Sequence, residues 1–311
     1  MTLVWLFTFI VSLYILIKAA DYFNLSAEKI GLSFNLSPFV IGVLLVAAGT
    51  SLPELVTSIA SILKGAPEMV AGNVMGSNVA NVFFVLGLAS VISGKFIHLN
   101  FDFSDIDIQY LTGSAVFLII TCYDQSFNRW EGIVGLIAFA AYLTYLNKAP
   151  LPENKKPDHA SSKAGLKYYI IFALSLVFLV IGGNYAIESV VNMAAIFKIQ
   201  EELIAATAIA AGTSLPELFV SLDAFKKNKA ELAIGNLAGS CIFNAFAVMG
   251  IASLFETLPI EGNIVTIGIP FTVFSSLLFF FTIRDKVINR FEGILYLVFY
   301  VLFLAKVLEI F

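Results

Sequence analysis

Two glutamates stand out because each lies inside a strongly apolar stretch of the chain. Residues 47–55 read AAGTSLPEL and residues 210–218 read the same nine letters, so Glu54 and Glu217 occupy equivalent positions 163 residues apart. A charged carboxylate at membrane depth costs on the order of 2.5–3.5 kcal/mol. No Lys or Arg lies in the middle of either stretch to pair with it. A bound cation is the simplest source of the missing positive charge.

Pro53 should open the helix that carries the first glutamate. Proline has no N–H and its ring crowds the carbonyl four residues earlier, so we expect the carbonyl of Gly49 to be left free. Thr50 and Ser51 precede Glu54 by four and three residues, which places the three side chains on one helix face. The second copy repeats this arrangement at Thr213, Ser214, Pro216 and Glu217.

A stripe of polar side chains follows each of these segments at the same offset. Its members are four residues apart and therefore share one helix face. They are Asn73, Ser77 and Asn81 in the first copy and Asn236, Ser240 and Asn244 in the second. The glycines beside them should allow another helix to approach closely; these are Gly72, Gly76, Gly235 and Gly239. The stripes are either ligands or hydrogen bonds between packed helices, and the pattern is compatible with both.

The combined donor set consists of carboxylate, hydroxyl, amide and carbonyl oxygens. Such hard donors suit Ca²⁺, Na⁺, Mg²⁺ or Mn²⁺. The clusters contain no His, and we expect Cys241, beside Ser240, to be a small packing residue. Two carboxylates neutralise one divalent ion or attract two or three monovalent ions. Because one anionic cage cannot hold both sets at once, it provides a physical basis for exchange.

The rest of the chain must hold these segments inside a bilayer. Of its 311 residues, 59% are hydrophobic and 13% are charged, about half the charged share of a soluble domain. With two Cys and a net charge of −4, this composition excludes a disordered chain, a disulfide scaffold and a nucleic-acid binder. A helix that crosses a bilayer core about 30 Å thick needs roughly 20 apolar residues. We predict ten such helices, at residues 3–20, 37–63, 68–93, 106–123, 130–146, 165–185, 202–225, 230–255, 264–283 and 291–308.

The basic residues are divided unequally between the two sides that these spans create. Fourteen of the 18 lie on one side and four on the other. The positive-inside rule places the richer side in the cytoplasm and both termini outside. We therefore expect a multi-pass protein of the plasma or inner membrane, with residues 147–164 as a cytoplasmic linker.

The repeat divides the chain into residues 1–146 and 165–311, with five predicted spans in each half. Because five is odd, the second half enters the membrane from the opposite side. The predicted fold is thus an all-α membrane protein of ten transmembrane helices, built as two inverted five-helix repeats with extracellular termini. Secondary transporters commonly have this architecture, with sites near the midplane where the repeats meet. A duplicated helical scaffold without transport is the alternative, but it leaves the buried polar clusters unexplained.

The motifs GTSLPEL and GNxxGSxxxN occur in both halves and resemble the α-repeats of the sodium/calcium exchangers, in the calcium/cation antiporter superfamily. The resemblance covers the full length and is strongest over residues 38–90 and 201–253. It implies alternating access, in which the spans at 3–20 and 165–185 slide past the other eight, and an exchange of three Na⁺ for one Ca²⁺. Proton-coupled members usually carry a different signature around the acidic residue, which favours sodium coupling here.

The resemblance also implies roles for the matching residues. Glu54 and Glu217 would bind both ions, and the carbonyls of Thr50 and Thr213 would join them at Ca²⁺. The flanking Na⁺ sites would be formed by the carbonyls of Ala47 and Ala210 with Ser51, Ser214, Ser77 and Ser240. Asn81 and Asn244 would complete the centre. Asn73 and Asn236 are further candidate ligands from their place on the stripes.

Two features depart from some relatives. Several members, including potassium-dependent exchangers, have Asp at the position of Asn244, so potassium dependence is not expected here. The linker is too short to hold the regulatory domains of animal exchangers. The chain is thus similar to a minimal, prokaryotic-type exchanger.

The predicted function is a sodium/calcium antiporter that exports Ca²⁺ in exchange for Na⁺, works as a monomer without an obligatory protein partner, and has no prosthetic group. A Ca²⁺/H⁺ antiporter is the nearest alternative, because one of two close carboxylates could carry a proton. A cation channel is a second alternative. A membrane enzyme is disfavoured, since the clusters lack His, Lys and a nucleophile–base pair.

Overall fold

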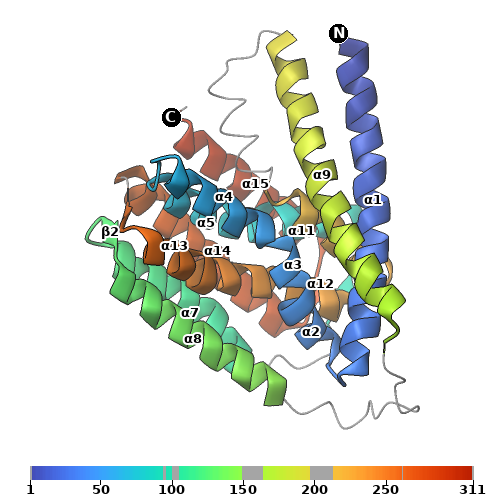
Figure 1. Ribbon diagram of the computed structural model, residues 1–311, viewed down its shortest axis with the longest axis horizontal. Coiled ribbons are helices and arrows are strands. Elements are labelled where there is room, and N and C mark those ends of the chain that lie inside the picture. The colour runs from blue at the N-terminus through green and yellow to red at the C-terminus, as the bar shows by residue number, and fades with distance from the viewer. Residues whose placement is uncertain are drawn as a thin grey trace.

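Helices dominate the computed structural model, which describes residues 2–93, 96–99, 105–148, 164–196, 213–260 and 262–309 (Figure 1). With η for π-helical segments, the helices are α1 (Thr2–Ser33), α2 (Pro38–Ile41), η1 (Gly42–Ala47), α3 (Ala48–Thr50), α4 (Leu52–Leu63), α5 (Met69–Val79), η2 (Ala80–Leu86), α6 (Gly87–Ser93), α7 (Asp105–Cys122), α8 (Arg129–Lys148), α9 (Leu166–Ile196), α11 (Leu215–Lys226), α12 (Ala230–Ile242), η3 (Phe243–Val248), α13 (Met249–Phe255), η4 (Ile264–Gly268), α14 (Ile269–Asp285) and α15 (Arg290–Val307). The short strands are β1 (Ile97–His98), β2 (Ser126–Phe127), β3 (Leu258–Pro259) and β4 (Val287–Ile288).

Most of the predicted spans coincide with helices. Nearly all of the predicted residues 37–63, 68–93, 106–123, 130–146, 230–255, 264–283 and 291–308 are helical. Six helices of the described ranges are long and apolar enough to cross a membrane: Leu3–Ser33, Pro38–Leu63, Met69–Ser93, Leu166–Met193, Ala230–Phe255 and Ile264–Asp285. Residues 202–212 of the predicted span at 202–225 lie outside the described residues, and the rest of that span is largely helical in α11. Most of the predicted linker at 147–164 also lies outside the described residues.

Two predicted helix ends are wrong. Helix α1 continues to Ser33 instead of ending at residue 20, and α9 continues to Ile196 instead of residue 185. In α1, the polar residues beyond residue 20 belong to the same continuous helix and meet polar partners on α11 and the turn after it.

These partners form what we call the α1–α11 clamp. Its members are Asp21, Asn24 and Glu28 of α1 with Asp223, Lys227 and Lys229 of α11 and the turn after it. The buried Asn24 donates from Nδ2 to the carbonyl of Val220 and to Asp223 Oδ2, both at 2.9 Å. Lys227 pairs with Asp21 and Asp223, and Lys229 pairs with Glu28. The clamp therefore fixes the C-terminal half of α1 to α11.

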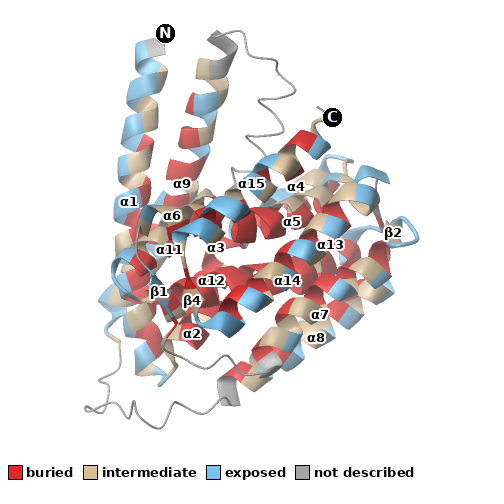
Figure 2. Cartoon of the chain, turned by 180° about the vertical axis from the view of Figure 1, so that it is seen from behind, coloured by how far each residue is buried: buried red, intermediate tan, exposed pale blue. Residues whose placement is uncertain are grey.

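Helices α1 and α9 run side by side and extend beyond the bundle formed by the other helices (Figure 1). The stacked rings of Phe23 and Phe172, with centroids 4.7 Å apart, join the two helices. Gly182 of α9 allows a close approach, since a Cβ there would lie 3.1 Å from Leu16 Cγ. Only 22% of the most apolar part of α1 and 28% of that of α9 are buried, so this pair leaves most of its surface free (Figure 2).

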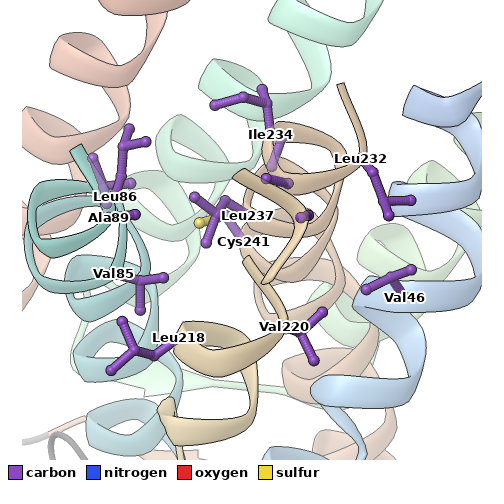
Figure 3. Packing of buried hydrophobic residues seen from close by; sticks show 14 of the residues in the cluster. Val46, Val85, Leu86, Ala89, Leu218, Val220, Leu232, Ile234, Leu237 and Cys241 are labelled. Carbon is purple, nitrogen blue, oxygen red and sulfur yellow. The ribbon is translucent and has the colours of Figure 1, made fainter. Parts of the chain in front are cut away.

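Helix α12 lies at the centre of the bundle and is almost wholly buried. Leu237 and Cys241 pack between Leu86 of η2 and Val46 of η1 (Figure 3). A Cβ on Gly235 would lie 2.4 Å from the carbonyl oxygen of Phe39, and the predicted close approach is confirmed there.

A Cβ on Gly239 would likewise lie 2.8 Å from Val43 Cα, which confirms the second close approach. Gly72 and Gly76 have no described neighbour at such short range. For this pair the close approach stays a prediction.

Each strand pairs with a strand from the other half of the chain. Strand β1 pairs with β4, with Ile97 opposite Ile288, and β2 pairs with β3, with Phe127 opposite Leu258. Both pairs are antiparallel, and they lie at opposite sides of the bundle (Figure 2). The pairs thus join loops of the first half to loops of the second half at two separate places.

Candidate cation site

A residue outside the α-helical region precedes each glutamate by three positions. Ser51 lies between α3 and α4 with φ −89° and ψ 4°, and Ser214 precedes α11 with φ −86° and ψ 2°. In the first half this residue interrupts the helix, as the following proline predicts. Glu54 and Glu217 therefore lie in the first turns of α4 and α11, where the helix dipole favours a negative charge.

The predicted site residues come together in the interior of the bundle. Glu54 and Glu217 are both 0% exposed. Also buried are Ala47, Thr50, Ser51, Ser77, Asn81, Ser214, Asn236, Ser240 and Asn244, while Asn73 and Thr213 are partly buried. Ala210 lies outside the described residues. Within the described ranges neither glutamate has an ion-pair partner.

Hydroxyl groups of the first half contact both glutamates. Ser51 Oγ of the first half donates to Glu217 Oε1 of the second at 3.3 Å. Ser77 Oγ donates to Glu54 Oε1 at 3.1 Å and lies 3.5 Å from Ser214 Oγ. The glutamates are thus held in one shared cluster.

Several buried polar atoms of this cluster have no hydrogen-bond partner among the described residues. The oxygens of this kind are Glu54 Oε2, Glu217 Oε2, Asn81 Oδ1, Ser240 Oγ and Asn244 Oδ1. An unsatisfied buried polar group costs about 1–3 kcal/mol, and more if it is charged. Ca²⁺ takes six to eight oxygen ligands of these kinds. A hard cation fits this donor set, because it would compensate both the charge and the missing contacts.

The first residue of each stripe makes hydrogen bonds that hold helices together. Asn73 Nδ2 donates to the carbonyl of Glu54 at 3.2 Å and to Ser58 Oγ at 3.1 Å. Asn236 Nδ2 donates to Ser221 Oγ at 3.0 Å, and Asn236 Oδ1 accepts from Thr50 Oγ1 at 3.1 Å. These contacts favour the packing interpretation for this position of the stripe.

The carbonyl of Ala47, a predicted ligand, already accepts a hydrogen bond from the Ser51 N–H at 2.9 Å. Thr50 Oγ1 lies 3.4 Å from this carbonyl but closer to Asn236 Oδ1, at 3.1 Å, and its one hydrogen serves one of the two oxygens. A carbonyl oxygen has two lone pairs, so the Ala47 carbonyl can bind a cation while the Thr50 hydroxyl bonds to Asn236.

Asn78 is a site residue that the sequence analysis missed. Its Oδ1 accepts from Asn244 Nδ2 at 3.2 Å, and Asn244 also donates to Ser77 Oγ at 3.2 Å. Asn78 Nδ2 donates to the carbonyl of Cys241 at 3.2 Å, and Cys241 Sγ lies 3.9 Å from the carbonyl of Asn78. Residues 78 and 241 are equivalent at the offset of 163. A comparison of the two halves that also considered non-identical residues at this offset could have found the pair.

Cys241 is buried, as predicted for a packing residue. In the described ranges no group of three or more His, Cys, Asp or Glu gathers to hold a metal. The cluster is therefore a cage of two carboxylates assisted by neutral oxygens.

The family model described as "Sodium/calcium exchanger protein" matches residues 4–147 and 167–308. Together with the buried cage, this match defines the chain as a membrane antiporter of cations. The chain belongs to the sodium/calcium exchanger family.

Individual relatives agree with this assignment. The chain is 33% identical to an uncharacterized membrane protein of Methanocaldococcus jannaschii, over 96% of both chains. It is 30% identical to the sodium/calcium exchanger MaX1 of Methanosarcina acetivorans, over 95% of this chain and 96% of that one. Among solved structures, the sodium-calcium exchanger NCX_Mj soaked with Na⁺ and Ca²⁺ superposes with a TM-score of 0.81 at 30% identity, covering 98% of this chain and 99% of that one.

Proposed function

We propose that this protein exports Ca²⁺ from the cell in exchange for Na⁺ by alternating access. The observation that carries the proposal is the set of buried oxygens around Glu54 and Glu217 that have no partner, and neither glutamate has an ion-pair partner among the described residues. A cation would compensate both the charge and the missing contacts. The same cage suits one Ca²⁺ or several Na⁺, so binding of one set excludes the other. The name of MaX1 as a sodium/calcium exchanger supports the same pair of ions.

The proposed ligands are divided between Ca²⁺ and Na⁺. Glu54 and Glu217 are central and serve both ions, with the carbonyls of Thr50 and Thr213 at Ca²⁺. Asn81 and Asn244 complete the centre through their Oδ1 atoms, which have no described partner. The flanking Na⁺ sites use Ala47, Ala210, Ser51, Ser214, Ser77 and Ser240.

The proposed architecture is two inverted repeats, residues 1–146 and 165–311, joined by a cytoplasmic linker at 147–164, in the plasma or inner membrane. Ten spans place both termini outside the cell, and the protein works as a monomer. The matching bounds of α4 and α11, at the offset of 163, support the duplication. So do the matching backbone angles of Ser51 and Ser214.

Reconstituted vesicles test this function directly. Vesicles loaded with Na⁺ should take up Ca²⁺ from a Na⁺-free medium, and an imposed pH gradient should not replace the Na⁺ gradient. Glu54→Gln and Glu217→Gln should each abolish uptake while the protein still folds. Glu256→Gln, at an exposed glutamate, is the matched control. Wild-type uptake in either cage variant would contradict the proposal.

A Ca²⁺/H⁺ antiporter is the second candidate, because each carboxylate keeps one oxygen without a described partner and two like charges in one cage favour a shared proton. Uptake that follows the pH gradient and ignores Na⁺ would establish it. Flux without any counter-ion would instead indicate a channel.

A further inference from the structure

A groove runs between α1 and α9 on the exposed side of the pair. It encloses about 360 Å³. Helix α1 lines it with Tyr14, Ile15, Lys18, Ala19 and Tyr22, and α9 lines it with Ile171, Leu174, Ser175 and Phe178. Tyr14 is 63% exposed and Leu174 is 53% exposed. The groove therefore opens toward the surroundings of the helix pair, which in a membrane are lipid.

Lys18 is the charged residue of this groove, and its side chain is exposed. Within the described ranges it has no ion-pair partner, since its neighbour Asp21 pairs with Lys227. The other lining side chains are apolar or aromatic, apart from Ser175, whose hydroxyl donates to the carbonyls of Ile171 and Phe172. An unpaired ammonium beside apolar groups at the membrane surface favours an anionic partner.

The two tyrosines are placed to assist such a partner. Tyr14 and Tyr22 lie one helical turn before and after Lys18, on the same stripe of α1. Their hydroxyls can donate hydrogen bonds, and tyrosine is enriched where lipid headgroups meet the hydrocarbon. Residues 3–17 contain no charged side chain, so Lys18 marks the end of the apolar part of α1. Its long stem can direct the ammonium to the interface.

We propose that this groove binds an anionic phospholipid of the cytoplasmic leaflet. The Lys18 ammonium holds the phosphate, and one acyl chain lies along Leu174 and Phe178. The choice of leaflet depends on the proposed orientation of the chain, whereas the binding itself does not depend on ion exchange. A lipid is favoured over a protein partner by the combination of one cation, two interfacial tyrosines and an apolar channel. Anionic lipid attracts a lysine near the membrane surface with about 1 kcal/mol.

Native mass spectrometry of the delipidated protein in detergent tests this site. The protein is titrated with dioleoyl phosphatidylglycerol or dioleoyl phosphatidylcholine, and the dissociation constant of the first bound lipid is measured. The wild type should prefer the anionic lipid by roughly fivefold, the ratio that corresponds to about 1 kcal/mol. Lys18→Gln should remove this preference. Leu174→Trp, which fills the groove, should weaken binding of both lipids.

Lys64→Gln is the matched control, because it removes one exposed lysine at the end of α4, away from the groove. Ile171→Trp is a second filling variant in case Leu174→Trp does not fold, and unfolding temperatures establish folding for each variant. Equal wild-type affinity for the two lipids, or an unchanged preference in Lys18→Gln, would overturn the proposal. The proposal would also be overturned if the filling variants turned a dimer into a monomer and left lipid binding unchanged. These measurements contain no Ca²⁺ or Na⁺ gradient, so they stand apart from the test of transport.

Discussion

The α1–α11 clamp allows a stability prediction that separates exposed charges from a buried amide. Lys227→Gln removes two ion pairs whose side chains are 16–44% exposed. Exposed pairs contribute about 0.2–1 kcal/mol each and are screened by salt. We therefore expect a loss of roughly 1 kcal/mol at low salt and little loss at high salt.

Asn24→Leu should behave differently. Asn24 is 1% exposed and donates two hydrogen bonds, one of them to the carboxylate of Asp223. The Val220 carbonyl remains inside α11 and Asp223 keeps Lys227, so the substitution leaves no isolated charge. The cost is that of two net hydrogen bonds, about 1–3 kcal/mol, and it should not depend on salt.

The assay is urea unfolding of the purified protein in detergent at about 50 mM and about 1 M choline chloride, which span weak and strong charge screening and keep Na⁺ out of the cage. Lys226→Gln is the control, because this neighbouring lysine is exposed and lies outside the clamp. If Lys227→Gln costs as much as Asn24→Leu and the cost persists at high salt, the reasoning from exposure is refuted.

Three further outcomes are expected. Ser77→Ala and Ser240→Ala should weaken the Na⁺ dependence of transport more than the affinity for Ca²⁺. Both are measured from the flux at varied Na⁺ and Ca²⁺ concentrations, and equal losses of Na⁺ dependence and Ca²⁺ affinity would contradict the proposed division of ligands. Gly235→Ala should lower the unfolding temperature, because its Cβ would meet the Phe39 carbonyl oxygen at 2.4 Å and overpacking costs about 1–3 kcal/mol. Gly262→Ala, at an exposed glycine with no described atom within 4 Å of the added Cβ, should be tolerated, and equal effects of the two substitutions would argue against the close packing. Burial lowers the pKa of Lys227, but its hydrogen bonds to Asp21 and Asp223 outweigh this and leave the pKa raised above 10.5. The stability that Lys227 contributes should then be constant from neutral pH to pH 10.5 and decline above it. A decline that begins near neutral pH, in unfolding followed against pH, would refute this assignment.

The duplicated motif made the centre of the site predictable. The nine identical residues contain a Pro, which predicts where the helix begins, and a Glu, which is the central candidate ligand. Helices α4 and α11 accordingly have matching bounds. The apolar runs likewise predicted most helices, because the thickness of the hydrocarbon core of the bilayer sets the length of a helix that spans it. Identity between the halves was thus the strongest signal in the chain.

The parts that escaped prediction depend on contacts between distant segments. The end of α1 could not be read from Asp21 and Glu28, because their partners lie some 200 residues away on a different element. Asn78 was missed for a related reason. Its counterpart in the second half is Cys241, so a search for identical residues in the two halves does not find it. The side chain of each of these two residues contacts the backbone carbonyl of the other.

The strand pairs have a consequence for how the chain is made. Because β1 and β2 pair with β4 and β3 in the part of the chain that the structure describes, the first half leaves the ribosome before the partners of its two strands have been made. The edges of these strands stay open until the last third of the polypeptide arrives. Assembly of the bundle is therefore completed late, and a truncated chain would expose both edges at once.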